Sequence, residues 1–308
     1  MIVRLMGGLG NQMFCYAFAK SLSLLKNTQV FLDYHNQDLK RITPQRRFEI
    51  DRFNLTVPIV YDFKIPKNQF ARIINNFLPK KYRLQKYKFP IYRDANLTPE
   101  YVINNNFEIN AYFLGYFQNI KYFIDIEQIL KNDFILKTPL SQNNQKLQNH
   151  ILSTKNSCFL HVRRGDYLGD TGFINLCQTN YYNEALKIIK DKLKKPHIFI
   201  FSNDMQWCKN HFLQTLDPKI TNGIFFDFVE GNGEGDAIEE MELMRSCKHS
   251  IKSNSTFSWW AAFLLNNKEK IVISPKEFFT RHVPNVDPDN LVIKDLDNSE
   301  RYFYIKLL

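Results

Sequence analysis

The sequence has no long hydrophobic run and few cysteines. Its longest apolar stretches, such as 259–265, are far shorter than the roughly 20 residues that a helix needs to cross a bilayer. The first residues, MIVRLMGGLGNQ, contain no charged segment followed by an apolar one, so we expect no secretory signal. The five cysteines are scattered and never spaced as Cys-x-x-Cys, which argues against a disulfide framework. Together these absences predict a cytoplasmic protein.

The composition shows an excess of positive charge. The 308 residues carry a formal net charge of +10, and their number and apolar content suffice for two ordinary domains. Such a charge favours a phosphate-bearing substrate, an anionic membrane surface or nucleic acid as partner. Basic residues concentrate among aromatic ones at 77–93, which predicts either a solvated face or a peripheral contact with anionic lipid on the inner face of the cytoplasmic membrane. No nucleic-acid-binding module is recognisable, so we expect no nucleic-acid partner.

The N-terminal residues follow a strand, turn, helix, strand order. A short apolar run at 2–6 ends at the glycine turn 7–10, and apolar residues then recur at helical spacing from Met13, with Asn11 as the expected helix N-cap. Residues 29–33 predict a second strand. This order indicates a β-α-β unit of a parallel sheet. Further along, we expect a strand at 112–117 and a helix at 122–130.

The second half of the chain alternates strands with helices. The apolar patterns predict strands at 158–162, 197–202, 223–228, 250–252 and 270–274, and helices at 182–193, 205–212, 236–247 and 255–265. Alternation of this kind is typical of a doubly wound parallel sheet. The polar, Asn-rich stretch 137–156 predicts a boundary between an N-terminal domain, 1–150, and a C-terminal domain, 151–308. We therefore expect an α/β fold of two Rossmann-like domains facing across a cleft, with the site at the carboxyl ends of the strands.

Two adjacent arginines stand directly after the strand predicted at 158–162. Arg163 and Arg164 therefore lie where such sheets bind ligands. A guanidinium group stays charged and binds phosphate oxygens in pairs, so this position suits a diphosphate. Asp166, three residues after Arg163, can orient one of the guanidinium groups. The alternative is a structural Arg–Asp pair on a surface turn.

A run of small polar residues, 253–256, precedes an apolar helix. Its hydroxyl and backbone N–H groups can cap that helix or hold an anionic ligand at the positive helix end. By itself such a cap is usually structural. We expect the following Trp259 and Trp260 to lie in the core rather than to stack on a ligand.

The glycine turn 7–10 also permits an oxidoreductase interpretation. Glycine lets a ligand approach the backbone closely, and Asp33 stands near the place of a ribose-binding acid. However, Met13 occupies the position where the dinucleotide fingerprint requires glycine or alanine. An NAD-dependent oxidoreductase therefore stays as an alternative.

Metal-binding patterns are weak. The paired acids at 287–289 and 295–297 fall outside the acid-after-strand context that a chelating Asp-x-Asp needs. Cys208 and His211 lie one helical turn apart without a second ligand pair nearby, which argues against zinc. We expect no metal site and no metal cofactor.

Four segments, in this order, resemble the bacterial α-1,2-fucosyltransferase family: GGLGNQMF at 7–14, HVRRGDY at 161–167, FSND at 201–204 and SNSTFSWW at 253–260. The segment 116–123 is similar to the Gly-Tyr-Trp-Gln…Tyr-Phe stretch of that family. The resemblance spans residue 1 to about residue 275. Cys15 and Phe117 depart from it, since glutamine and tryptophan are common at these positions.

The resemblance implies a GT-B fold and an inverting transfer of L-fucose from GDP-β-L-fucose to the 2-hydroxyl of a terminal β-galactoside. The acceptor would belong to a lipopolysaccharide, an O-antigen or an oligosaccharide such as lactose, and no divalent metal would be required. The N-terminal domain would face the acceptor and the C-terminal domain would bind the donor.

The same resemblance implies roles for single residues. Arg163 would contact the β-phosphate, His161 and Asp236 would recognise the guanosine, and Asn11 would reach the donor near the scissile bond. The further expected donor-binding residues are Gly10, Gln12, Arg164, Asn203, Ser255, Thr256 and Phe257.

The chemistry of such a transfer fits these assignments. Breaking the fucose–phosphate bond builds negative charge on the diphosphate, which a fixed cation stabilises without a metal, and Arg163 is the expected cation. Asp166 and Asp170 are candidate acceptors for the proton of the attacking hydroxyl, although a sufficiently dissociative transition state needs no strong base. A basic, non-catalytic adaptor at the membrane surface is the last alternative, and it predicts that the Arg163–Arg164 pair is dispensable.

Overall fold

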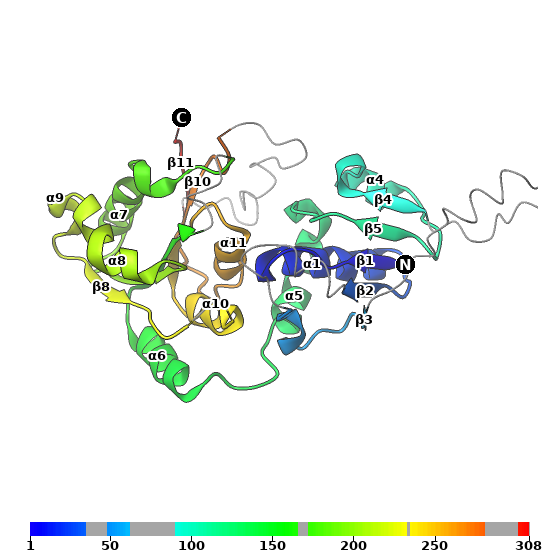
Figure 1. The fold of residues 1–308 in the computed structure, drawn as a ribbon, viewed down its shortest axis with the longest axis horizontal. Helices are drawn as coiled ribbons and strands as arrows, with labels where there is room; N and C mark the ends of the chain where they lie inside the picture. Colours follow the sequence, from blue (N-terminus) through cyan, green and yellow to red (C-terminus); the bar gives the residue numbers. More distant parts are fainter. Residues whose placement is uncertain (35–47, 62–89, 166–171, 233–234, 281–300, 308) are drawn as a thin grey trace, which may run out of the picture.

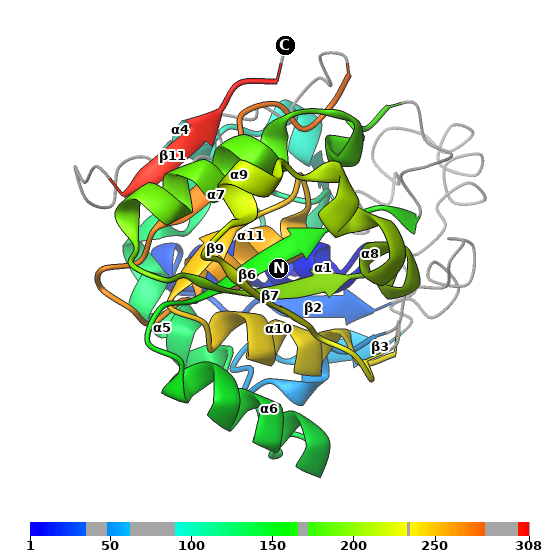
Figure 2. The same ribbon diagram turned by 90° about the vertical axis from the view of Figure 1, so that its left-hand side faces the viewer.

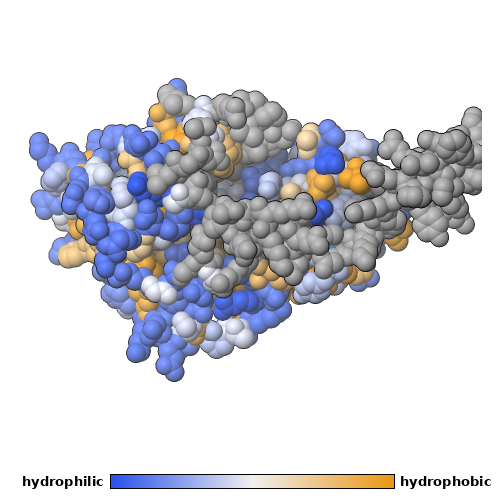
Figure 3. Space-filling view, viewed as in Figure 1, coloured by the Kyte–Doolittle hydropathy of each residue, from blue (hydrophilic) through white to orange (hydrophobic). Residues whose placement is uncertain are grey.

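The computed structural model describes residues 1–34, 48–61, 90–165, 172–232, 235–280 and 301–307. The described residues form two parallel β-sheets, each flanked by helices, which lie side by side along the longest axis of the molecule (Figure 1). None of the described helices combines the length and the apolar composition that crossing a bilayer requires. On the face shown in Figure 3, hydrophilic residues dominate the outer end of the C-terminal domain, around α8 and α9.

The N-terminal sheet has strand order β3-β2-β1-β5-β4, with every neighbouring pair parallel. Its strands are β1 (Ile2–Arg4), β2 (Phe31–Tyr34), β3 (Ile59–Tyr61), β4 (Ile91–Arg93) and β5 (Tyr112–Leu114). The accompanying α-helices are α1 (Leu9–Leu25), α4 (Pro99–Asn104) and α5 (Glu127–Asp133). The chain order reverses between β1 and β5, which creates a crevice at the carboxyl ends of these two strands.

The C-terminal sheet has strand order β11-β10-β9-β6-β7-β8, again all parallel. Its strands are β6 (Ser157–Val162), β7 (His197–Ser202), β8 (Phe225–Phe228), β9 (His249–Ile251), β10 (Val272–Pro275) and β11 (Tyr302–Ile305). This is the doubly wound order in which the switch point, and hence the ligand crevice, lies between the first and fourth strands, here β6 and β9.

Helices cover both faces of the C-terminal sheet, with α7 and α10 on opposite sides of it (Figure 2). The helices of this half are α6 (Gln142–Ser153), α7 (Tyr181–Lys192), α8 (Met205–His211), α9 (Pro218–Thr221), α10 (Ala237–Arg245) and α11 (Thr256–Phe263). Short 3-10 turns complete the described elements: η1 (Ile50–Arg52), η4 (Asp94–Asn96), η5 (Ile120–Tyr122), η6 (Ile124–Ile126), η8 (Leu176–Gln178) and η9 (Phe212–Thr215).

One hydrophobic core runs from the N-terminal sheet into the C-terminal one. Phe14 of α1 places its ring 4.8 Å from that of Trp259 and 5.0 Å from that of Trp260, both on α11. Phe123 stacks on Trp260 at 5.5 Å, and both tryptophans are fully buried. Such aromatic pairs contribute about 0.5–1.5 kcal/mol each beyond their buried area. The prediction that the two tryptophans are core residues is therefore confirmed, and their packing joins the two halves.

The predicted α/β fold of two parallel-sheet domains is confirmed, while several element bounds differ. Asn11 is not the N-cap of the first helix, because α1 begins at Leu9 and Gly8 occupies the cap position. The series of strands does not close at 274, since β11 follows and pairs with β10. The polar stretch that was expected to separate the domains contains α6, so the boundary predicted at residue 150 falls inside a helix.

Candidate active site

The two switch points place the predicted motifs at the carboxyl edges of the sheets. In the C-terminal sheet, β6 ends with His161 and Val162, and β9 is followed by residues 252–255. In the N-terminal sheet, β1 leads into the glycine turn 7–10 and β5 into residues 115–118. Helix α1 packs against α11, and this packing brings the glycine turn to the serine-rich segment. The motifs thus meet at one place.

His161 is held from two sides at the end of β6. Its Nδ1 lies 2.7 Å from Oγ of Ser253, and its backbone oxygen accepts a hydrogen bond of 3.0 Å from the hydroxyl of Tyr182. The side chain is buried, and its ring centroid lies 5.8 Å from that of Phe257. The imidazole orientation is thereby fixed, which suits a residue that reads a flat, polar ligand such as a nucleobase.

The first turns of α1 and α11 meet at Gly10. A Cβ atom at this position would lie 2.7 Å from the backbone nitrogen of Phe257 and 2.8 Å from Oγ1 of Thr256, so only glycine fits. Ser255 caps α11 by accepting a hydrogen bond of 3.3 Å from the Phe257 N–H. The N-terminal ends of two helices thus converge, and both carry partial positive charge and backbone N–H groups that favour an anion.

The glycine turn wraps around Asn11. Gly7 has φ +69°, a conformation that favours glycine, and a Cβ there would lie 2.5 Å from Nδ2 of Asn11. The buried Gln12 donates from Nε2 to the Gly7 oxygen at 3.0 Å, which closes the turn. On the other side, Oδ1 of Asn11 accepts a hydrogen bond of 2.9 Å from Nε2 of Gln118. The Asn11 amide is therefore oriented by the loop after β5.

The loop after β5 is held by Asp94, which the sequence patterns did not reveal. Phe117 has the unusual φ of +51°, and its N–H donates to Oδ2 of Asp94 at 2.8 Å. Burial raises the pKa of Asp94, although hydrogen bonds from Phe117 and Tyr116 act in the opposite direction. The Phe117 ring stacks on Phe18 at 3.9 Å. A strained residue is thus fixed next to Gln118, as is common at functional sites.

Arg164 is held by the FSND segment. Its Nε lies 3.0 Å from Oδ2 of Asp204, its guanidinium carbon lies 4.0 Å from the centre of the Trp207 ring, and its backbone N–H donates to Oδ1 of Asn203 at 2.9 Å. The acid that orients this arginine is Asp204, 40 residues away in the sequence. Asp166, which we expected to orient one of the two arginines, lies outside the described residues, as does Asp170. The FSND segment thus acts as a brace for the arginine turn.

Arg163 is half-buried beside an acid that sequence reasoning missed. Burial raises the pKa of Glu240, in the first turn of α10, to about 7, although the charge of Arg163 acts to lower it. Asp236 is exposed at the N-cap position of the same helix, and its side chain makes no capping hydrogen bond. The first turn of α10 therefore lies within electrostatic reach of the arginine turn.

Lys252 is a second residue that the sequence patterns did not single out. It directly follows β9, and the register of β6 and β9 places it beside His161. It is 1% exposed, and burial lowers its pKa to about 7. Among the residues that the structure describes, no acid lies close enough to influence that pKa. Burial favours the neutral amine, and an anion bound beside it would favour the protonated form, so this lysine is suited to an anionic ligand.

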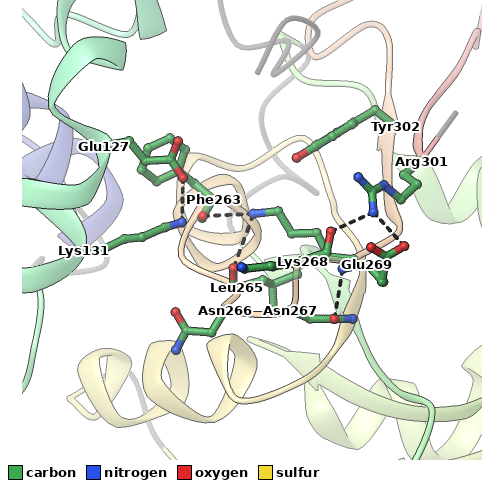
Figure 4. A pocket seen from close by; sticks show the side chains of 11 residues that line it. Glu127, Lys131, Phe263, Leu265, Asn266, Asn267, Lys268, Glu269, Arg301 and Tyr302 are labelled. Carbon is green, nitrogen blue, oxygen red and sulfur yellow. Dashed lines mark hydrogen bonds and ion pairs between the residues drawn. The ribbon is translucent and has the colours of Figure 1, made fainter. Parts of the chain in front are cut away.

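A pocket of about 410 Å³ lies elsewhere, between α5 and the C-terminal end of α11 (Figure 4). Lys131 is paired with Glu127 at 2.6 Å, and Lys270 donates to the backbone oxygens of Ala262 and Phe263 at 3.2 Å each. Lys131 is thus occupied by its ion pair, and Lys270 by the backbone oxygens at the end of α11. The pocket is also remote from the carboxyl ends of the strands, so we do not assign the reaction to it.

Comparison with known proteins identifies the family. The model of glycosyl transferase family 11 matches residues 1–283. The chain belongs to glycosyl transferase family 11. The oxidoreductase and adaptor alternatives are therefore set aside, and the protein is a glycosyltransferase.

Two curated relatives from Escherichia coli cover nearly the whole glycosyltransferase. An α-1,2-colitosyltransferase is 31% identical over 92% of this chain and 94% of its own length. The O-antigen biosynthesis glycosyltransferase WbnK is 34% identical over 89% of this chain and 93% of its own length. A galactoside α-(1,2)-fucosyltransferase 2 of gorilla is 23% identical over 85% of this chain and 68% of its own. In fold, the chain resembles the α-1,6-fucosyltransferase NodZ, with a TM-score of 0.50 and 15% identity over 86% of this chain and 92% of that one. The GT-B architecture is thereby confirmed.

Proposed function

We propose that this glycosyltransferase moves L-fucose from GDP-β-L-fucose to the 2-hydroxyl of a terminal β-galactoside in a surface glycan, with inversion to an α-linkage. The observation that carries the proposal is the convergence of α1 and α11 at Gly10, beside the arginine turn and the buried Lys252. Two helix N-termini together with Arg163 and Lys252 favour a ligand with several negative charges, as a nucleoside diphosphate has. The family relationship and the α-1,2 relatives support the reaction type.

In this proposal the C-terminal domain binds the donor. Arg163 and Lys252 stabilise the charge that develops on the departing diphosphate. Ser255 and Thr256 provide N–H groups at the α11 end, and Phe257 contributes its ring beside His161. His161, with Asp236 and Asn203 nearby on the same sheet edge, contacts the guanosine part. Arg164 supports the turn that carries Arg163, because its own guanidinium is engaged by Asp204 and Trp207.

The N-terminal domain faces the acceptor in this proposal. Asn11, oriented by Gln118, reaches the donor near the bond that breaks, and Gln12 and Gly10 shape the turn around it. The hydroxyl of the acceptor attacks the anomeric carbon as the diphosphate leaves. We propose Asp166 as the acceptor of its proton, with Asp170 as the other candidate. No step requires a metal.

A second donor is favoured by one specific relative. The 31% identity to an α-1,2-colitosyltransferase makes activated colitose a candidate donor. Colitose is fucose without its 3-hydroxyl, so a site built to bond that hydroxyl discriminates strongly against colitose. Competition between the two nucleotide sugars in one reaction therefore distinguishes the proposals.

The test is the release of GDP from GDP-fucose in buffer containing EDTA, with lactose or another β-galactoside. Acceptor-dependent release, followed by linkage analysis of the product, is the expected result. Binding of GDP without turnover would contradict the proposed pair of substrates and point to another acceptor glycan or to another GDP-sugar, such as activated colitose. The absence of both turnover and GDP binding would contradict the donor assignment. Association with vesicles of anionic lipid tests the proposed membrane contact of residues 77–93, most of which lie outside the described part of the chain.

A further inference from the structure

Three residues from distant parts of the sequence meet near the amino-terminal end of β7 in the C-terminal sheet. His150 lies in the last turn of α6, His197 is the first residue of β7, and Asp227 lies in β8. Nε2 of His150 is 3.0 Å and Nε2 of His197 is 2.8 Å from the same atom, Oδ2 of Asp227. We call these three residues the His–Asp–His triad. The candidate active site lies at the other end of β7, where Ser202 is five residues further along the strand than His197.

The two imidazole rings are held in place by aromatic contacts. The His197 ring stacks on Phe199 at 4.7 Å with an interplanar angle of 7°. The His150 ring meets Phe199 edge-on at 5.4 Å and His197 edge-on at 5.7 Å. The side chains of His150 and Asp227 are 50% and 42% exposed, so solvent reaches the triad. The imidazole rings are therefore held in place, while the exposed side of the triad lets an ion enter and leaves room for water ligands.

The distances within the triad are close to those of a metal centre. The three potential ligand atoms lie within 4.8 Å of one another. Zinc binds imidazole nitrogen and carboxylate oxygen at about 2.0–2.2 Å, so tetrahedral ligands lie roughly 3.3–3.5 Å apart. Separations of 2.8 and 3.0 Å therefore need to widen only slightly. Two imidazoles with one carboxylate suit zinc, cobalt, nickel or copper rather than calcium or magnesium.

We propose that the His–Asp–His triad binds one divalent transition-metal ion, which fastens the end of α6 to the β7–β8 edge. On binding, both Nε2 atoms give up their hydrogen bonds to the carboxylate and coordinate the ion, with the ring proton carried on Nδ1. Water completes the coordination. The other end of α6 is already anchored, since Oε2 of Glu239 accepts hydrogen bonds from the Ser141 hydroxyl at 2.8 Å and from Asn144 at 2.6 Å. The ion is structural and takes no part in sugar transfer.

Zinc titration of the full-length, tag-free protein tests this proposal. The protein is stripped with EDTA, exchanged into metal-free buffer and titrated with ZnCl2 in a calorimeter. We expect binding of about one ion per chain and a rise in the midpoint of thermal unfolding. Asp227→Asn and His150→Gln should each weaken that binding by at least about 100-fold, because each removes a ligand and loss of a mere second-shell partner already costs about 10–100-fold. His211→Gln, at an exposed histidine of α8 outside the triad, should leave it unchanged.

Two results would overturn the proposal: no zinc binding by the wild-type protein, or equal binding by wild type, Asp227→Asn and His150→Gln. Circular dichroism establishes that each variant is folded. Because His150 is half-exposed on the surface of α6, His150→Gln keeps the test decisive if the Asp227 variant does not fold. Transfer activity is not a readout here, so the outcome is independent of the proposed donor and acceptor.

Discussion

The amide oxygen of Asn11 accepts a hydrogen bond of 2.9 Å from the amide of Gln118, which joins the first turn of α1 to the loop after β5. The contact spans 107 residues of sequence and lies at the switch point of the N-terminal sheet. Its two partners come from the two segments that most resemble the fucosyltransferase family in this half of the chain. The loop that fixes Gln118 is itself fixed by Asp94. A chain of contacts therefore leads from the end of β4 to Asn11.

Replacing Gln118 by leucine should impair turnover more than donor binding. Without its partner, the Asn11 amide loses its orientation, which we expect to lower kcat by about tenfold, equivalent to about 1.4 kcal/mol of transition-state stabilisation. The Kd for GDP should change less than twofold. Gln128→Leu, at an exposed position on α5, is the matched control. Equal kcat values for Gln118→Leu and wild type would remove Gln118 from the site.

Arg163→Ala should abolish most of the transfer while leaving the protein folded. Loss of one preorganised group that stabilises developing charge typically lowers kcat by about 10²–10³. Arg164→Ala should instead lower stability, because it removes the ion pair with Asp204 and the contact with Trp207. Steady-state kinetics and thermal unfolding of both variants separate the two roles. Wild-type turnover in the Arg163 variant would contradict the proposed function.

Gly10→Ala should push α1 and α11 apart. The added methyl group would lie 2.7 Å from the Phe257 nitrogen, and overpacking of this kind costs about 1–3 kcal/mol. Both thermal stability and GDP affinity should fall, since the converging helix ends separate. Gly231→Ala is the control, because a Cβ there meets nothing within 4 Å and only its φ of +90° is disfavoured. If Gly10→Ala binds GDP as tightly as wild type, the helix ends do not hold the diphosphate.

Lys252→Met should stabilise the protein at neutral pH and weaken its binding of GDP. The pKa of this lysine is about 7 when folded and about 10.4 when unfolded, so between these values the unfolded state binds more protons and stability rises with pH. The stability gain of the variant should therefore be largest below pH 7 and vanish near pH 10. Thermal unfolding of both proteins from pH 6 to 10 measures it. A gain that is independent of pH would show that the folded lysine keeps an ordinary pKa.

Contacts that follow from local pattern were predictable, and contacts between distant segments were not. The strand at 197–202 matches β7 residue for residue, because a continuous apolar run is typical of a strand buried on both faces. The brace of Arg164 by Asp204 was not predicted, because it depends on which strands are neighbours. Asp94 lies outside the four segments that resemble the family and Lys252 lies just before one of them, so only burial and the sheet register show their roles.

The error at Asn11 has a local cause. Asparagine is a favoured N-cap, whereas glycine is only moderately so, and the pattern of apolar residues begins at Met13. In the structure the helix starts earlier, at Leu9, because the first turn is stabilised by its contact with α11 rather than by a capping side chain. Tertiary packing therefore decided where this helix begins.

The aromatic contacts of Phe14 with Trp259 and Trp260 determine how the chain unfolds. They lie in one core that includes strands of both sheets, so heating or denaturant should melt the two sheets in a single cooperative transition rather than in two. Neither half, expressed alone, would keep its apolar surface covered. The N-terminal and C-terminal halves are thus one folding unit, and exchanging either half between relatives would require the residues around Phe14 to be exchanged with it.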